Sequence, residues 1–283
     1  MNKLSIERQT QVIKVLCEGN SIRSTARITG TAINSVIKLL CEVGAACEKY
    51  QDKNLRHLSC KRIECDEIWS FCYAKERNVP EEHKGKLGYG DVWTFVAIDA
   101  DSKLCLTWLV GWRDPENAFD FALDIRRRLS TRVQLTTDGH RMYLNAMGYV
   151  FGSDAYYAIL VKLYGKLESG IEGKYSPPKC ISAKAQRISG HPDLSKASTS
   201  YVERQNLTMR MQMRRYTRLT NGFSKKIENH KYALALYFMH YNFVKTHSTL
   251  ANPYPRTPAM AAGITDHIWS AEEIVHLINS DKS

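Results

Sequence analysis

The sequence predicts an α/β protein in which helices precede a mixed β-sheet with helices on its faces. Up to about residue 60 the apolar residues recur at helical spacing. From Ile63 onward, short apolar segments typical of strands alternate with helical segments, which is the pattern of an α/β domain. We therefore expect an all-α domain over residues 1–58, the α/β domain over residues 59–250 and a C-terminal tail over residues 251–283.

The N-terminal segment is typical of a helix-turn-helix. After a first helix over Ser5–Glu18, two short helices over Ser21–Ile28 and Ala32–Cys41 flank a turn that contains Gly30. Such a turn presents the second helix to a DNA groove. The residues that would face the groove are Asn34, Ser35 and Lys38. An ordinary three-helix packing module has the same periodicity and is the alternative interpretation.

The α/β domain is expected to form five strands in the order β-β-β-α-β-α-β-α. The tight turn Asp101-Ser102-Lys103 makes the first three strands an antiparallel meander. Asp114 followed by Pro115 begins the first helix, which runs to Leu129, and a short helix through Tyr143–Met147 follows the fourth strand. The strands span Arg62–Tyr73, Val92–Ala100, Leu104–Trp112, Arg132–Thr137 and Tyr156–Leu163.

The chain after the fifth strand lacks periodicity. Residues 165–199 are rich in Gly, Ser, Pro and Lys, so we expect a flexible loop there. Two long helices should follow, over Ser200–Leu219 and Ile227–Phe243, and the prolines from Pro253 onward end the second.

Positive charge exceeds negative charge in the protein. The 40 Lys and Arg residues stand against 29 Asp and Glu residues, which gives a net charge of +11 and a pI near 9.2. A basic balance of this size favours a polyanionic partner. The longest mainly apolar segment, Tyr232–Phe243, is shorter than the roughly 20 residues of a membrane helix. Because Met1–Asn20 also lacks the apolar core of a secretory signal, we expect a cytoplasmic protein without a membrane span.

The eight cysteines include no CxxC pair. In a reducing cytosol they should be thiols. Cys60, Cys65 and Cys72 could be combined with His57 and His83 as a zinc cluster, but these spacings match no common structural zinc site.

Three carboxylates occupy positions that packing does not require. Asp66 lies inside the first strand, Asp138 at the end of the fourth strand, and Glu203 in the first turn of the long helix. The first and fourth strands should be neighbours in the sheet, so these side chains can meet at one rim. Carboxylates this close repel one another unless a cation lies between them. Oxygen ligands suit Mg²⁺ or Mn²⁺, and two such ions about 4 Å apart support phosphoryl transfer.

Each carboxylate also has an ordinary interpretation. Asp66 could be a surface charge of an edge strand that carries further acids. Asp138 followed by glycine could form a simple turn. Glu203 could complete a capping box with Ser200 and so satisfy a backbone amide of its own helix.

Three segments resemble the catalytic blocks of DDE transposases from bacterial insertion sequences. They are Cys65–Phe71 with the sequence CDEIWSF, Leu135–Gly139 with LTTDG, and Ser200–Arg210 with SYVERQNLTMR. The segments Arg214–Lys226 and Tyr241–Pro258 are also similar to that family, most closely to its insertion-sequence-1 group. Each segment alone is a weak signal, and their occurrence in the family's order makes the resemblance specific.

The resemblance implies a ribonuclease-H-like catalytic core, with a mixed five-stranded sheet and flanking helices. Asp66, Asp138 and Glu203 would hold two Mg²⁺ or Mn²⁺ ions, hydrolyse a phosphodiester at each element end and transfer the new 3′-hydroxyl to target DNA. Some members of the group carry an N-terminal zinc finger. Without a CxxC pair here, recognition of the ends would depend on the helix-turn-helix and on basic surfaces.

Residues 204–231 contain eight cations and one acid, Glu228. Glu203, Asn206 and Arg210 should share one helix face, so a phosphate bound by Arg210 would lie near the metal site. A solvated helix face is the alternative, but charge of one sign favours a DNA backbone. The cations assigned to DNA contact are Arg204, Arg210, Arg214, Arg215, Arg218, Lys225 and Lys226.

The expected partner is double-stranded DNA, both terminal repeats and target, bound by a nucleoid-associated homo-oligomer that pairs two ends. Two other functions remain open: a DNA-binding regulator with an inactive core, and a ribonuclease-H-like nuclease. A protein-interaction scaffold explains neither the cations nor the carboxylates.

Overall fold

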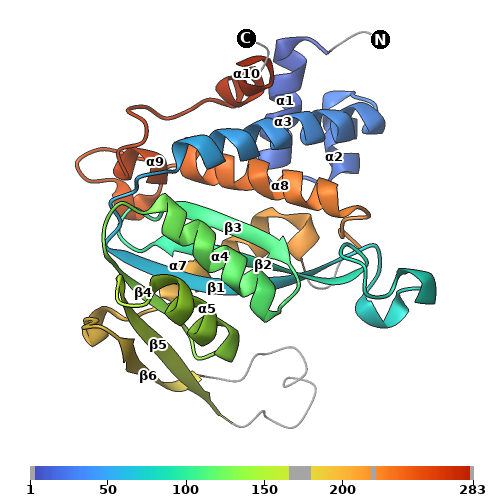
Figure 1. Cartoon of the computed structure of the whole chain (residues 1–283). Helices are drawn as coiled ribbons and strands as arrows, with labels where there is room; N and C mark the ends of the chain where they lie inside the picture. The colour runs from blue at the N-terminus through green and yellow to red at the C-terminus, as the bar shows by residue number, and fades with distance from the viewer. Residues whose placement is uncertain (1–3, 166–179, 218–220, 281–283) are drawn as a thin grey trace.

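The computed structural model describes residues 4–165, 180–217 and 221–280. Within them, the chain forms one six-stranded sheet. Helices α4 and α5 cover one face of this sheet and α7 covers the other, while α3 and α8 run side by side next to it (Figure 1). The strands are β1 (Arg62–Cys72), β2 (Gly90–Asp99), β3 (Cys105–Gly111), β4 (Val133–Asp138), β5 (Ala155–Tyr164) and β6 (Cys180–Ser189). The helices are α1 (Ile6–Cys17), α2 (Ile22–Thr29), α3 (Ile33–Asn54), α4 (Pro115–Arg128), α5 (Arg141–Phe151), α7 (Ser200–Gln212), α8 (Ile227–Met239), α9 (Pro258–Ala261) and α10 (Ala271–Ser280).

The strand order in the sheet is β3-β2-β1-β4-β5-β6. β1, β2 and β3 form an antiparallel meander, β4 and β5 run parallel to β1, and β6 is antiparallel to β5. A meander that continues from its first strand into two parallel strands is the topology of a ribonuclease-H-like sheet. The predicted meander is confirmed, and so is the predicted pairing of the first strand with the fourth.

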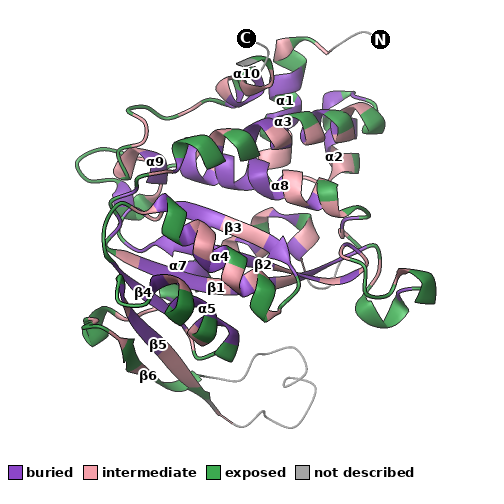
Figure 2. Ribbon diagram, in the orientation of Figure 1, coloured by how far each residue is buried: buried purple, intermediate pink, exposed green. Residues whose placement is uncertain are grey.

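The sheet has six strands, not the five that the sequence predicts. The additional strand is β6, which lies in the segment expected to be a flexible loop; residues 166–179 of that segment are outside the described residues. β6 is an edge strand exposed along nearly its whole length, as the green ribbon in Figure 2 shows. Because neither face of β6 is buried, its sequence has no apolar alternation from which a strand could be predicted.

The N-terminal helices pack as a bent group that continues into the rest of the core. α2 and α3 meet at a bend of 112°, and Gly30 ends α2 with a positive φ of 63°, which confirms the predicted glycine turn. α3 does not end at Cys41 as predicted but continues to Asn54. Its later half packs along α8, where a Cβ on Gly44 would lie 2.5 Å from the backbone oxygen of Tyr232. Glycine therefore permits this close helix contact.

α7 ends at Gln212 rather than at the predicted Leu219. The chain continues as a short 3₁₀ helix, Arg214–Tyr216, and the buried hydroxyl of Tyr216 is hydrogen-bonded to Thr94 at 2.7 Å and to His230 at 2.8 Å. These bonds hold the segment against β2 and α8.

The C-terminal segment contributes to the core. α10 packs against α1 and α3 and buries Ile274 and Val275. Among the helices that the structure describes, none alone has the length and apolar composition to cross a membrane; α2 and α3 meet that measure only as a bent pair.

Candidate metal-binding carboxylate site

Asp66 and Asp138 meet where β1 and β4 separate. The parallel pairing of these strands ends at Glu64 opposite Thr136, and Asp66 and Asp138 each lie two residues further on, at the carboxyl end of β4. Carboxylate oxygens of Asp66, Glu67 and Asp138 all lie within 4.8 Å of one another. The fold thus brings Asp66 and Asp138, two of the three predicted carboxylates, together. It also adds Glu67, the residue that follows Asp66.

The environment of Asp66 disfavours its charged form. Burial raises the pKa of Asp66 to about 7, and the negative charges of Glu67, Asp138 and Glu203 act in the same direction. The side-chain amide of Asn206 on α7 donates a hydrogen bond to Oδ2 of Asp66 at 2.8 Å. A cation bound between the carboxylates would remove the repulsion and restore the charged form.

Asp138 also takes part in a turn. Its Oδ1 accepts a hydrogen bond from the backbone N–H of His140 at 3.0 Å, and His140 precedes the first residue of α5. The turn considered from the sequence therefore forms, and it places the carboxyl group of Asp138 beside Asp66 at the same time.

Glu203 lies on α7, one turn before Asn206, and its negative charge contributes to the raised pKa of Asp66. The Glu203 carboxylate accepts from the hydroxyl of Thr199 and forms an ion pair with Lys162 of β5. The capping box with Ser200 does not form, because Thr199 precedes the helix and gives it no side-chain cap. The Glu203 side chain, 44% exposed, is therefore not bound to the amides of its own helix.

The first turn of α7 is held instead by Glu64 of β1. Oε2 of this buried carboxylate accepts hydrogen bonds from the backbone N–H groups of Tyr201 at 2.7 Å and Val202 at 3.1 Å. Strand alternation places Glu64 on the same face of β1 as Asp66. The strand that carries Asp66 thus also positions the helix that carries Glu203.

Sequence reasoning did not assign roles to Glu64, Glu67 or Lys162. The acids beside Asp66 looked like surface charges, yet the Glu64 and Glu67 residues are only 3% and 8% exposed. Lys162 lies on β5 and only the fold brings it to Glu203. The available signal was the density of acids in β1, since three of them within four residues are unusual in a buried strand.

The residues present fit a divalent cation. The donors are carboxylate oxygens, which Mg²⁺ and Mn²⁺ prefer. Oε2 of Glu67 is buried beside the Tyr143 hydroxyl and makes no hydrogen bond of normal geometry among the described residues, and burial raises the pKa of this carboxyl as well. Buried oxygens without a partner are costly, and a cation would satisfy them.

The sequence-predicted DNA-contact residues differ in exposure. Arg204, Arg214, Lys225 and Lys226 are exposed, and Arg210 is half-buried. Burial lowers the pKa of Arg215, whose side chain packs beside Tyr216. Arg218 lies outside the described residues. In the N-terminal helices Asn34 is exposed, Ser35 is half-buried, and exposed Lys38 forms an ion pair with Glu42 at 3.7 Å.

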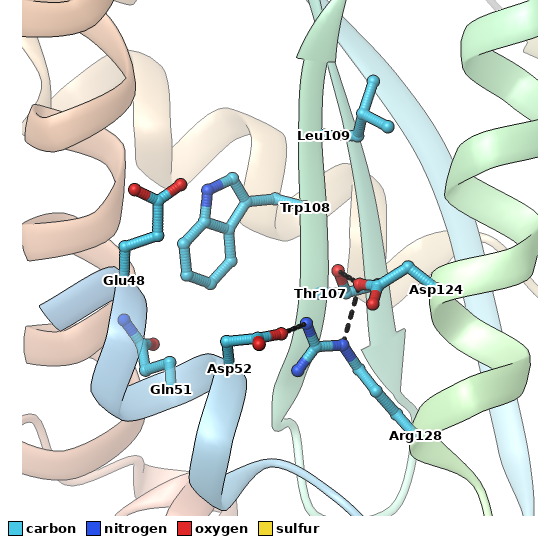
Figure 3. Close-up of a pocket in the computed structure, with 8 residues that line it drawn as sticks. All are labelled: Glu48, Gln51, Asp52, Thr107, Trp108, Leu109, Asp124 and Arg128. Atoms are coloured by element: carbon cyan, nitrogen blue, oxygen red, sulfur yellow. Dashed lines mark hydrogen bonds and ion pairs between the residues drawn. The ribbon is translucent and has the colours of Figure 1, made fainter. Parts of the chain in front are cut away.

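A separate hollow of about 290 Å³ lies between α3, β3 and α4 (Figure 3). Arg128 of α4 occupies one side of it and forms ion pairs with Asp52 of α3 and Asp124 of α4, each at 2.8 Å. Thr107 donates to the same Asp124. Asp52, Thr107, Asp124 and Arg128 bind one another, so this side of the hollow connects α3 with β3 and α4.

No protein-family model and no curated protein matches the sequence. Among solved structures, a pre-cleavage Mos1 transpososome matches at 9% identity and a TM-score of 0.25, over 56% of this chain and 60% of the Mos1 chain. The Mos1 strand transfer complex matches at 11% identity and 0.23, over 56% and 59%. A piggyBac transposase synaptic complex with hairpin DNA matches at 10% identity and 0.37, over 97% and 70%. The chain thus spans about three fifths of the length of the Mos1 chains.

Proposed function

We propose that the protein is a DDE transposase that hydrolyses a phosphodiester at each end of a DNA element and then transfers the new 3′-hydroxyl to target DNA. The observation that carries this proposal is the meeting of Asp66 and Asp138 at one rim of a ribonuclease-H-like sheet, with Glu203 on a helix docked to the same strand. The sequence blocks around these residues resemble those of the insertion-sequence-1 group.

Asp66, Asp138 and Glu203 would hold two Mg²⁺ or Mn²⁺ ions. When bound, such ions lower the pKa of the attacking hydroxyl or water and neutralise the leaving oxygen in phosphoryl transfer. The protein itself fixes the carboxylates. Asn206 holds Asp66 by its amide, and Glu64 holds the first turn of the helix on which Glu203 lies.

Two surfaces support DNA as the substrate. Exposed cations follow Glu203 along α7 and the segment after it, and a cluster of positive charge attracts a phosphate backbone. The bend of 112° between α2 and α3 lies in the range of helix-turn-helix motifs, and exposed Asn34 and Lys38 lie in the first turns of α3. We assign recognition of the ends to α3, with the protein acting as a homo-oligomer that pairs two ends.

The test is cleavage and joining of a duplex that carries the element end, in Mg²⁺. Asp66→Asn, Asp138→Asn and Glu203→Gln should each abolish cleavage while DNA binding stays within about threefold of the unchanged protein. Asp120→Asn and Glu116→Gln, which alter exposed acids of α4, are the matched controls and should cleave normally. Full cleavage by any of the three variants would remove that residue from the site.

The same assay separates the two other functions. DNA binding without metal-dependent cleavage by the unchanged protein would indicate a regulator. Cleavage without any joined product would indicate a nuclease that does not transfer strands.

A further inference from the structure

Glu67 follows Asp66 on β1 and faces the opposite side of the strand. Its side chain is only 2% exposed. Oε1 accepts a hydrogen bond from Nε of Arg113 at 2.7 Å and forms an ion pair with its Nη2 at 2.5 Å. Oε2 is buried and makes no hydrogen bond of normal geometry in the described part of the chain, and the buried hydroxyl of Tyr143 is the neighbouring polar group. Arg113 thus binds one carboxylate oxygen of Glu67, and the other oxygen is left without a well-formed hydrogen bond.

The separation of β1 from β4 explains how Glu67 reaches the other carboxylates. Their pairing ends at Glu64 opposite Thr136, so no backbone ladder lies between Glu67 and Asp138. Carboxylate oxygens of Asp66, Glu67 and Asp138 come within 4.8 Å of one another from the two faces of the strand. Two oxygens bound to one Mg²⁺ at about 2.1 Å are at most about 4.2 Å apart, so a small side-chain movement would bring all three onto one ion.

We infer that Glu67 is a third protein ligand of a divalent cation held with Asp66 and Asp138, and that Arg113 fixes Oε1 so that Oε2 faces the ion. Arg113 is itself held over the ring of Trp93, 4.7 Å from its centroid. This ligand set comes from β1 and β4 alone, so it is complete without α7, and Glu203 is left for a second ion. The inference rests on the proposed function in one respect: the ion is the one that cleavage would use.

The competing interpretation is that Glu67 only forms a structural ion pair with Arg113. That pair uses Oε1 and leaves Oε2 with only the buried Tyr143 hydroxyl as a polar neighbour, without a hydrogen bond of normal geometry between them. Three ionised carboxylates would outnumber the one guanidinium, and an ion pair alone does not balance that charge. A divalent cation accounts for both features.

The test measures Mn²⁺ binding to the full chain without DNA, by isothermal titration calorimetry. Loss of a residue that only hydrogen-bonds a metal's ligand weakens metal sites by about tenfold to a hundredfold, so loss of a direct ligand in Glu67→Gln should weaken Mn²⁺ binding at least about tenfold. Asp66→Asn and Asp138→Asn should do the same, and Glu116→Gln, an exposed acid of α4, should change nothing.

The outcomes separate this inference from the proposed function. Unchanged Mn²⁺ affinity in Glu67→Gln, with loss in Asp66→Asn and Asp138→Asn, would overturn the role of Glu67 and leave the function standing. Unchanged affinity in all three would overturn the metal site and the function with it. If Glu67→Gln lowers the unfolding midpoint in EDTA, Glu67→Asp replaces it. This variant keeps the charge for Arg113 but withdraws the oxygens by one methylene, so a ligand role predicts weaker Mn²⁺ binding and a purely structural role predicts no change.

Discussion

Glu64 accepts the backbone N–H of Tyr201 at 2.7 Å, so the strand that carries Asp66 holds the first turn of the helix that carries Glu203. The same oxygen accepts from Val202, the residue directly before Glu203. A buried carboxylate at a helix N-terminus satisfies amides that the helix cannot pair and interacts favourably with the helix dipole. One side chain therefore links two of the carboxylates that are far apart in the sequence.

Glu64→Ala should destabilise the first turn of α7 and lower the cleavage rate without removing a metal ligand. Loss of a helix cap costs about 1–2 kcal/mol, so the free energy of unfolding measured in urea should fall by that amount. The kcat for cleavage should fall because Glu203 is displaced, while KM for DNA should change little. Glu64→Gln keeps an acceptor oxygen and should recover part of both. Equal kcat in Glu64→Ala and the unchanged protein would contradict this role.

Asn206→Asp should set a further carboxylate against Asp66. The present amide donates to Oδ2 of Asp66, and an aspartate in its place would repel that oxygen. We expect the unfolding midpoint in EDTA to fall by several degrees, more than in Asn206→Ala, which removes the bond without adding charge. Mn²⁺ should recover more of the loss in Asn206→Asp than in Asn206→Ala. The two variants can be compared by differential scanning fluorimetry, and identical midpoints in EDTA would count against the repulsion.

The central part of the fold was predictable because its strands are buried and bounded by clear turns. Asp114 caps α4 by accepting from the N–H of Asn117 at 2.8 Å, as the Asp-Pro pair predicted. β6 was missed because both of its faces are exposed, so burial imposes no pattern on it. The length of α3 was missed because its end is set by packing on α8, and that partner is far away in the sequence.

The candidate site was predictable to a similar degree. The meeting of Asp66 and Asp138 follows from strand order, which the sequence pattern indicates. The partner of Glu203 does not follow, because Lys162 comes from a strand whose register is set by the whole sheet. The unused oxygen of Glu67 also depends on three-dimensional detail, namely where Arg113 lies.

Lys162→Met should tighten metal binding while leaving stability nearly unchanged. The pair with Glu203 is partly exposed, at 22% for Lys162 and 44% for Glu203, and such pairs contribute less than about 1 kcal/mol. Without the ammonium group, Glu203 no longer has a cation that competes with a metal ion. We expect Mn²⁺ affinity at the Glu203 site to rise about threefold to tenfold in calorimetry. Lys184→Met on the exposed β6 is the matched control, and a fall in affinity in Lys162→Met would show that Lys162 supports the site instead.

His230 should make the protein sensitive to mild acid. Its imidazole is fully buried, with Nε2 at 2.8 Å from the hydroxyl of Tyr216 and Nδ1 at 3.0 Å from the hydroxyl of Ser224. Burial, with a smaller contribution from the charge of Arg215, lowers the pKa of His230 to about 3. The unfolded chain binds this proton near pH 6.5 and the folded chain does not, so stability is lost as the pH falls below about 6.5.

His230→Asn should remove this part of the pH dependence. One group with this shift costs up to about 1.4 kcal/mol per pH unit, or about 2–3 kcal/mol between pH 6.5 and pH 4.5. In urea titrations over that range the free energy of unfolding of His230→Asn should fall less steeply, although the variant starts from a lower value because the bonds to Tyr216 and Ser224 are disturbed. His191→Asn, at an exposed position, should keep the slope of the unchanged protein. Equal slopes for His230→Asn and the unchanged protein would mean that other groups cause the loss in acid.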